Sequence, residues 1–185
     1  MSGVSIREAA EDDFAAITAI YASWVRDACG TFELVPPSET EMRARFAYVK
    51  ALGMPYLVAE HQGRVVGYAY AGPFRAREAY RYMVEDSIYL DPQAQGIGAG
   101  GALLDHLILE CTRRGARQMV AVIGDSENTA SIGLHRSRGF ADSGRFHAAG
   151  WKLDGWRDVI FMQKPLGDGD ATPPDGAGLA LSDKA

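Results

Sequence analysis

A glycine-rich run followed at once by an amphipathic helix is the feature that most constrains the fold. Residues 95–101 read Gln-Gly-Ile-Gly-Ala-Gly-Gly, and apolar residues then recur at helical spacing over residues 103–111. Residues 87–90, just before the run, have a strand pattern. A strand, a glycine loop and a helix N-terminus together form an anion site, because free backbone N–H groups and a positive helix dipole meet there. We therefore predict a phosphate-binding loop, with a tight turn before a flexible helix start as the alternative.

The rest of the chain alternates strand and helix patterns. The apolar run at residues 119–123 is typical of a central strand buried on both faces. Ser38 and Glu41 form a capping-box pattern, and Asn128 can cap a later helix. The predicted order, β-α-α-β-β-β-α-β-α-β-β, indicates one layered α/β domain. The predicted strands are 4–7, 56–60, 64–71, 87–90, 119–123, 140–149 and 159–163, and the predicted helices are 14–28, 38–49, 103–111 and 128–138.

Composition excludes several classes of protein. The 185 residues are 47% hydrophobic and 23% charged, as in an ordinary soluble domain. The 24 acidic and 19 basic residues give a formal charge of -5, which argues against a nucleic-acid partner. Cys29 and Cys111 lack the spacing of metal ligands, so we expect reduced thiols and no metal. With no signal-peptide core and no apolar run of membrane-spanning length, the sequence predicts a cytoplasmic protein without a membrane partner.

The last residues have a different character. Residues 167–185 are rich in glycine, proline and aspartate and have almost no apolar periodicity. Such a composition favours a disordered tail. We therefore predict a domain at residues 1–166 and a disordered tail at 167–185.

The nature of the bound phosphate compound is a separate question. No Gly-Lys-Ser/Thr follows the loop, which excludes a Walker A motif. Gly96, Gly98 and Gly101 match the dinucleotide pattern GxGxxG, and Asp125 follows a later strand, so a dinucleotide oxidoreductase is one alternative. Against it, five residues separate the strand from the first glycine, and the upstream helix pair and hairpin are not parallel βα units.

The loop also matches a second pattern, which resembles the cofactor loop of a known enzyme family. Gln95-x-x-Gly98-x-Gly100, between a strand and a helix, resembles the acetyl-CoA pyrophosphate loop of the GNAT N-acetyltransferases. Residues 128–140 are similar to the Asn…Leu-Tyr…Gly-Phe segment of that family, with His135 where most members have tyrosine. Further segments look like the phosphinothricin/methionine sulfoximine N-acetyltransferase subfamily. These segments are residues 85–90, 120–124, 148–152 and 156–159, within a resemblance that covers residues 4–166.

The resemblance implies a fold, a reaction and partners. The fold is a mixed, mostly antiparallel central sheet flanked by helices. Acetyl-CoA is the co-substrate, and its acetyl group goes to the α-amine of a small amino acid analogue such as phosphinothricin, methionine sulfoximine or methionine sulfone. The subfamily also implies a homodimer.

Catalytic roles follow from the same resemblance. Glu85 corresponds to the general base, acting directly or through water, with a solvated strand-end carboxylate as the alternative. His135 stabilises the tetrahedral intermediate or protonates the departing thiolate. Asp86 points to the opposite face of the strand and has no assigned role. The backbone N–H near Leu90 donates to the thioester carbonyl, and we expect a bulge there to separate the strand from its neighbour.

Binding residues are assigned in two groups. Gln95 stands where some relatives have arginine, so cofactor affinity rests more on backbone N–H groups. Two arginines near the acceptor can clamp an anionic substrate, although a solvated basic loop is the alternative. Trp156 and Asp158 support the sheet or a dimer interface. The cofactor group is Ile88, Leu90, Gln95, Gly96, Ile97, Gly98, Ala99, Gly100, Gly101, Asn128 and Ser131, and the substrate group is Phe32, Arg75, Arg77, Tyr80 and Tyr89.

Two further hypotheses stay open besides the oxidoreductase. One is acetyl transfer to another amine, such as a peptide terminus or a polyamine. A CoA-binding module without turnover would share the same loop.

Overall fold

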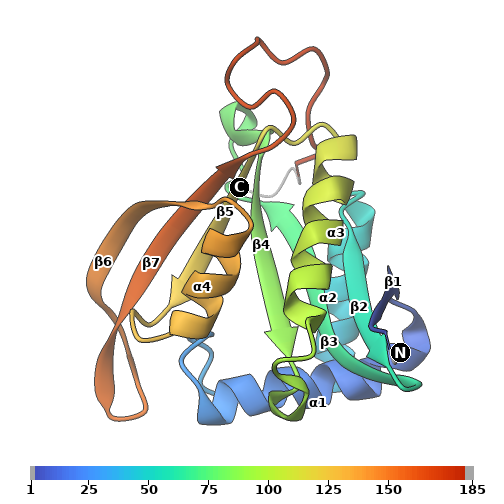
Figure 1. Ribbon diagram of the computed structural model, residues 1–185, viewed down its shortest axis with the longest axis vertical. Helices are drawn as coiled ribbons and strands as arrows, with labels where there is room; N and C mark the ends of the chain where they lie inside the picture. The colour runs from blue at the N-terminus through green and yellow to red at the C-terminus, as the bar shows by residue number, and fades with distance from the viewer. Residues whose placement is uncertain (1–2, 182–185) are drawn as a thin grey trace.

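The computed structural model describes residues 3–181 and has the element order that the sequence predicts. Helices flank a central sheet (Figure 1). The strands are β1 (Ser5–Glu8), β2 (Tyr56–His61), β3 (Arg64–Pro73), β4 (Met83–Leu90), β5 (Gln118–Gly124), β6 (Ala141–Lys152) and β7 (Gly155–Pro165). The helices are α1 (Phe14–Asp27), α2 (Glu39–Ala51), α3 (Ala99–Arg113) and α4 (Thr129–Ser137), with 3₁₀ turns at Glu11–Asp13, Glu78–Tyr80 and Pro92–Ala94.

The sheet is mixed and mostly antiparallel, as expected. Its strand order is β1-β2-β3-β4-β5-β7-β6, and β4 with β5 is the one parallel pair among the described strands. That pairing is short, running from Met83↔Gln118 to Asp86↔Ala121. Beyond these residues β4 continues along β3, whereas β5 continues along β7, so the two central strands separate.

The expected bulge near Leu90 is not present. The register of β3 against β4 runs without a shift from Pro73↔Val84 to Gly67↔Leu90. The strand opens because its pairing with β5 ends after Asp86, and no extra residue is inserted. The end of the β4–β5 ladder therefore separates the two strands, which is the effect that was expected of a bulge.

The two faces of the sheet carry different helices, and β4 contributes to both. On one face, Leu103, Leu104 and Leu107 of α3 are fully buried, and α4 lies beside them (Figure 1). On the other face, α1 and α2 cover a row of tyrosine rings that includes Tyr56, Tyr68 and Tyr89. Because successive strand side chains alternate, each residue of β4 faces one layer or the other.

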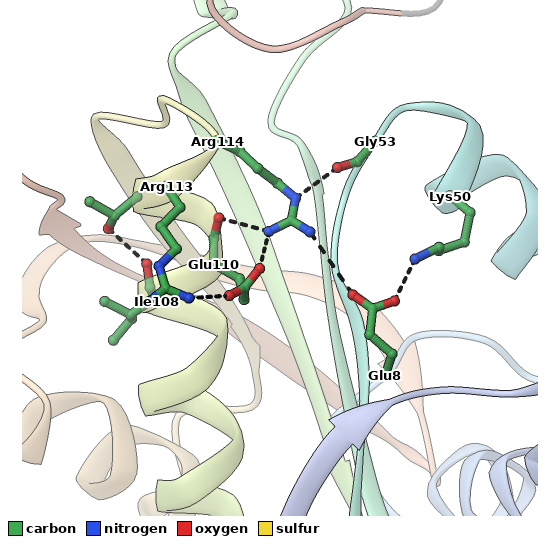
Figure 2. Close-up of polar contacts among 8 residues, drawn as sticks. Glu8, Lys50, Gly53, Ile108, Glu110, Arg113 and Arg114 are labelled. Atoms are coloured by element: carbon green, nitrogen blue, oxygen red, sulfur yellow. Dashed lines mark hydrogen bonds and ion pairs between the residues drawn. The ribbon is translucent and has the colours of Figure 1, made fainter.

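The C-terminal end of α3 is fixed by a polar network around Arg114 (Figure 2). Its guanidinium donates to the Gly53 carbonyl at 2.9 Å and to the Glu110 carbonyl at 3.0 Å. Glu8 of β1 lies 3.9 Å away and accepts from Lys50 at the end of α2. Arg114 thus joins three elements that are distant in the sequence.

The segment after residue 166, whose composition favours disorder, makes specific contacts with the domain. Arg117 donates to the carbonyls of Gly169 and Thr172 at 2.9 and 3.0 Å. Leu179 is 7% exposed, and its N–H donates to the Arg81 carbonyl at 2.7 Å. Residues 167–181 therefore contact the domain, and the remainder of the expected tail, 182–185, lies outside the described residues.

Replacing Arg114 tests the polar network. Arg114→Ala leaves the Gly53 carbonyl and the Glu8 carboxylate with fewer partners, so we expect the free energy of unfolding to fall by about 1–2 kcal/mol. The matched control is Arg113→Ala, because Arg113 is 65% exposed and its guanidinium pairs with Glu110 alone among the described residues. Its effect should stay within about 0.5 kcal/mol. Urea unfolding measures both, and equal values would contradict the role given to Arg114.

Candidate active site

A cavity of about 450 Å³ occupies the opening between β4 and β5. In the antiparallel ladder with β3, Phe74 N–H donates to the Met83 carbonyl and Asp91 N–H donates to the Val66 carbonyl. Hydrogen-bonded pairs recur at every second residue, so Ile88 and Leu90 turn their backbone groups away from β3. They face the cavity, where β5 no longer pairs with them. The Leu90 N–H predicted as a donor therefore points into the opening.

Trp24 of α1 fixes this edge of β4. Its indole Nε1–H donates to the Leu90 carbonyl at 2.8 Å, and its ring also lines the cavity. A Cβ at Gly30 would lie 2.9 Å from that ring, so glycine is needed there for close packing. Trp24 lies within the predicted helix 14–28, and its role could not be predicted because helical periodicity does not show the polar partner of an indole.

The glycine loop presents free backbone donors to the same cavity. Gly96 and Gly98 have φ values of 79° and 86°, which favour glycine. Gly98 is the N-cap of α3, and no side chain caps the helix. The first helical bond runs from Ala102 N–H to the Gly98 carbonyl, so the preceding N–H groups have no partner within the helix. An anion at this helix start meets both these donors and the positive end of the helix dipole.

Arg138 supplies a cation that sequence analysis missed. Its guanidinium lies over the first turn of α3, where a Cβ on Gly101 would sit 1.9 Å from one of its nitrogens. Arg138 also lines the cavity, and it contacts Asp105 at 3.4 Å. The sequence did hold a signal for this contact. Because glycine has a low helix propensity, a glycine in the first turn of a helix indicates that another group approaches the backbone closely there.

The donor set fits a diphosphate joined to an extended arm. The helix start and Arg138 match a diphosphate, while the unpaired edge of β4 matches an amide-containing arm such as pantetheine. Among residues 3–181, no cluster of three His, Cys, Asp or Glu side chains could hold a metal ion. Within the same residues, no helix combines the length and apolar character needed to cross a membrane.

Asp86 and His135 form a buried pair at the point where the two strands separate. His135 Nε2 lies 3.0 Å from Asp86 Oδ2, and Nδ1–H donates to the Ser131 carbonyl at 2.8 Å. The side chains are 4% and 2% exposed. Because Nδ1 already carries a hydrogen, the second contact needs one more proton, held on the imidazole or on the carboxyl group.

The charge balance of this pair favours a protonated ring. Burial lowers the pKa of His135, but the hydrogen bond and the charge of Asp86 outweigh it, so the pKa is raised above its usual value. Asp86 Oδ1 is buried without a hydrogen-bond partner among the described residues, and the residue lines the cavity. Sequence analysis placed Asp86 correctly on the face opposite Glu85 but did not foresee its partner.

Glu85 lies on the face covered by α1 and α2. Its backbone pairs with Gly72, and burial raises the pKa of its carboxyl group, with Arg75 acting in the opposite direction. A second cavity of about 650 Å³ is lined on this face by Gly72, Tyr70 and Arg75, together with Arg45 of α2. The carboxylate therefore lies near that cavity and is partly desolvated.

The cofactor residues predicted from sequence are largely brought together. Ten of the eleven line the 450 Å³ cavity, and the exception, Ile97, is 39% exposed. They are Ile88, Leu90, Gln95, Gly96, Gly98, Ala99, Gly100, Gly101, Asn128 and Ser131.

The predicted substrate residues are more dispersed. Tyr89 lines the cofactor cavity, and Arg75 lines the second cavity with its guanidinium 4.2 Å from the Phe74 ring centre. Arg77 is exposed in the following loop, and Tyr80 is 41% exposed. Phe32 is 37% exposed and packs against Gly150 of β6. Tyr70 and Arg45 also line the second cavity but were not predicted as site residues. A tyrosine in a strand is typical of a buried core, and an arginine on a helix is typical of a solvent-exposed face.

Comparison with known proteins gives consistent matches. Residues 17–140 match the family model described as Acetyltransferase (GNAT) family. A phosphinothricin N-acetyltransferase of Alcaligenes faecalis is 50% identical over 92% of this chain and 87% of its own length. An L-methionine sulfoximine/L-methionine sulfone acetyltransferase of Salmonella typhimurium is 40% identical over 92% of this chain and 98% of its own. The crystal structure of a Sinorhizobium meliloti phosphinothricin acetyltransferase with AcCoA has a TM-score of 0.91 at 47% identity, covering 96% of each chain.

Filling the space above Gly101 tests the diphosphate site. In Gly101→Ala the new methyl group displaces the Arg138 guanidinium and narrows access to the helix start, so the Kd for acetyl-CoA should rise at least ~10-fold. Gly133→Ala in α4 is the control, because a Cβ there meets nothing within 4 Å. Isothermal titration calorimetry compares the two, and unchanged affinity in Gly101→Ala would refute this site.

The Asp86–His135 pair predicts a pH dependence of stability. Since the pKa of His135 is raised above about 6.5, the folded protein binds the extra proton more tightly than the unfolded chain does. Its stabilising contribution is full below about pH 6.5 and is lost as the pH rises through the folded-state pKa. Urea unfolding between pH 6 and 9 should show this decline in the wild type but not in Asp86→Asn. Asp142→Asn, at an exposed ion pair, is the control and should keep the wild-type slope.

Proposed function

The chain belongs to the GNAT acetyltransferase family, and from this premise we propose that it acetylates the α-amine of a small amino acid analogue. The acceptor is of the phosphinothricin, methionine sulfoximine or methionine sulfone type. Acetyl-CoA is the co-substrate of this N-acetyltransferase. The observation that carries the proposal is that β4 borders a cofactor cavity with its open edge and carries a partly desolvated carboxylate on its opposite face.

The chain holds acetyl-CoA with backbone groups more than with side-chain charges. The N–H groups at the start of α3 and the Arg138 guanidinium bind the diphosphate. The edge of β4 at Ile88 and Leu90 binds the arm, and acetyl-CoA supplies an acetyl thioester. The Leu90 N–H donates to the thioester oxygen as negative charge develops on it. Trp24 keeps that peptide oriented through its bond to the Leu90 carbonyl.

Glu85 acts as the general base. The attacking nitrogen must lose a proton, because a free α-ammonium group has a pKa near ~8 and is mostly protonated at pH 7. Burial raises the pKa of Glu85, which makes its carboxylate a stronger proton acceptor than an exposed one. The first proton passes to Glu85 directly or through water, and the nitrogen then bonds to the carbonyl carbon. The nitrogen loses its second proton to water, and the carbon–sulfur bond breaks with its electron pair leaving on sulfur as the thiolate.

His135 is suited to the opposite proton transfer. The ring lies on the cofactor face of β4, and Asp86 favours its protonated form. A protonated imidazole can stabilise the developing negative charge through its own positive charge, and giving a proton to the departing thiolate requires that the ring first release its bond to Asp86 or to Ser131. Glu85 and His135 therefore serve different ends of the reaction from opposite faces of one strand.

Arginine side chains are suited to recognise the acceptor. Arg75 and Arg45 line the cavity near Glu85, and a guanidinium group binds carboxylate and phosphinate oxygens in a bidentate manner. We assign Arg77, Tyr80, Phe32 and Tyr89 to the periphery of the acceptor. The charge of Arg75 also keeps Glu85 from becoming too weak an acid, since it lowers the carboxyl pKa.

We further propose a homodimer and a cytoplasmic location. The hairpin of β6 and β7 exposes several large apolar side chains that lack a covering element among the described residues. Trp151 and Trp156 lie 5.5 Å apart between ring centres, and large exposed apolar groups that gather in this way are typical of a protein interface. The free thiols of Cys29 and Cys111 support a reducing compartment. The exposed side chains are Phe146, Trp151, Leu153 and Trp156, at 62%, 56%, 48% and 65%.

An amine screen tests the proposed reaction. Protein and acetyl-CoA are mixed with methionine sulfone, methionine sulfoximine, phosphinothricin, a polyamine or a peptide, and CoA release is read with a thiol reagent. We expect the three amino acid analogues to give the highest kcat/KM. Preference for a polyamine or a peptide would redirect the acceptor assignment, and acetyl-CoA binding without thiol release would indicate a binding module.

Glu85→Gln tests the general base. The amide keeps the shape of the side chain but cannot accept the proton, so kcat/KM for the acceptor should fall by ~10²–10⁴-fold. Affinity for acetyl-CoA should stay unchanged, because Glu85 faces away from the cofactor cavity. The control is Glu78→Gln, an exposed carboxylate in the Glu78–Tyr80 turn. Near-normal turnover by Glu85→Gln would exclude the assigned role.

The exposed hairpin predicts a specific oligomer. Sedimentation velocity should show a dimer for the wild type and a monomer for the double variant Trp151→Ala/Trp156→Ala. The double variant removes two of the four large exposed apolar side chains on this hairpin. Leu109→Ala, at a 46% exposed position on α3, is the control and should remain dimeric. A monomeric wild type would disprove the proposed interface.

A further inference from the structure

The C-terminal segment reaches the cavity beside Glu85. Leu181 lines the 650 Å³ cavity together with Tyr70, Phe74 and Arg75. It is the one cavity residue that does not come from α2 or from β3 and the loop after it. The residues just before Leu181 contact the domain, and these contacts determine where Leu181 lies.

Two hydrogen bonds and one buried leucine hold this segment against the end of the loop formed by residues 74–82. Leu179 N–H donates to the Arg81 carbonyl at 2.7 Å, and the Leu179 side chain is 7% exposed. The Tyr82 hydroxyl donates to the Gly176 carbonyl at 2.5 Å. Arg81 and Tyr82 directly follow the Glu78–Tyr80 turn, in the loop that begins with Phe74 and Arg75. The segment therefore contacts the end of this loop and lines the same cavity as the first residues of the loop.

Gly178 allows the close approach of the two backbones. Its φ is 74°, and a Cβ would lie 2.8 Å from the Arg81 carbonyl oxygen and 2.7 Å from Arg81 Cγ. A side chain at this position must therefore push the segment away from the domain. Gly176 differs, because a Cβ there would meet only the Gly178 nitrogen, at 4.0 Å. Alanine at Gly178 should therefore disturb the contact with Arg81, and alanine at Gly176 is its matched control.

We propose that residues 176–181 form the outer wall of the acceptor cavity and that Leu181 determines specificity for the acceptor side chain. This proposal rests on the proposed function, in which the cavity beside Glu85 takes the acceptor. The charged end of the amino acid lies toward Arg75, and its distal end meets an apolar wall built by Leu181 and Phe74. Such a wall limits the length of the side chain that fits.

Substituting Leu181 measures the wall directly. Steady-state kinetics compare methionine sulfone with ethionine sulfone, which is one methylene longer. Leu181→Ala should raise kcat/KM for ethionine sulfone relative to methionine sulfone by roughly tenfold, the usual effect of one methylene. Leu181→Phe should shift the ratio the other way, and KM for acetyl-CoA should not change. Ala171→Ser, at an exposed position of the same segment but outside residues 176–181, is the control. An unchanged ratio in both Leu181 variants would overturn the proposal.

The glycine pair gives a second measurement that needs no turnover. Hydrogen exchange of residues 74–82 is compared in full-length Gly178→Ala and Gly176→Ala proteins. We expect faster exchange of this loop in Gly178→Ala alone, because only that substitution separates the segment from Arg81. Equal exchange in the two variants would refute the docking that the proposal requires. If the wild type acetylates no amine, the proposed function fails on its own, whereas the exchange comparison still decides whether the segment organises the loop.

Discussion

The early end of the pairing between β4 and β5 is the constraint on which the rest of the site depends. Four residue pairs hold the two central strands together, and beyond Asp86 and Ala121 each strand keeps only its outer neighbour. A sheet that loses a ladder in its middle leaves backbone donors unsatisfied, which is costly unless another group meets them. Here the free edge at Ile88 and Leu90 borders a cavity, where under the proposed function it binds the arm of the cofactor.

Side chains replace the missing ladder as the links across the opening. The Asp86–His135 pair connects β4 to α4, and the bond from Trp24 to Leu90 connects β4 to α1. A buried ionic pair adds little net stability when its desolvation is counted, but breaking it by removing one partner is costly. The pair therefore fixes the geometry of the strand at the point where the backbone no longer does.

Much of the fold could be predicted from the sequence, and the reason is that its signals are local. The periodicity at residues 103–111, the apolar run at 119–123 and the glycine loop each act within one element, and each is found where expected. The contacts that were missed join distant residues. His135 lies 49 residues from Asp86, and Arg138 covers Gly101 without any spacing rule to connect them. The contacts of residues 167–181 with the domain were not predicted, because Leu179 and Leu181 are isolated apolar residues in a stretch that is otherwise rich in glycine, proline and aspartate.

The alternation of side chains along β4 has a consequence for how such an enzyme changes over generations. Cofactor groups such as Arg138 and His135 lie on one side of the sheet, whereas Arg75 and Leu181 lie on the other. The sheet separates Arg75 and Leu181 from the groups on the cofactor side, while Trp24 and Tyr89 border the cofactor cavity from the acceptor side. Under the proposed function, substitutions at Arg75 or Leu181 would change acceptor preference with little effect on cofactor affinity, so a lineage could explore new amines while its hold on acetyl-CoA is inherited intact.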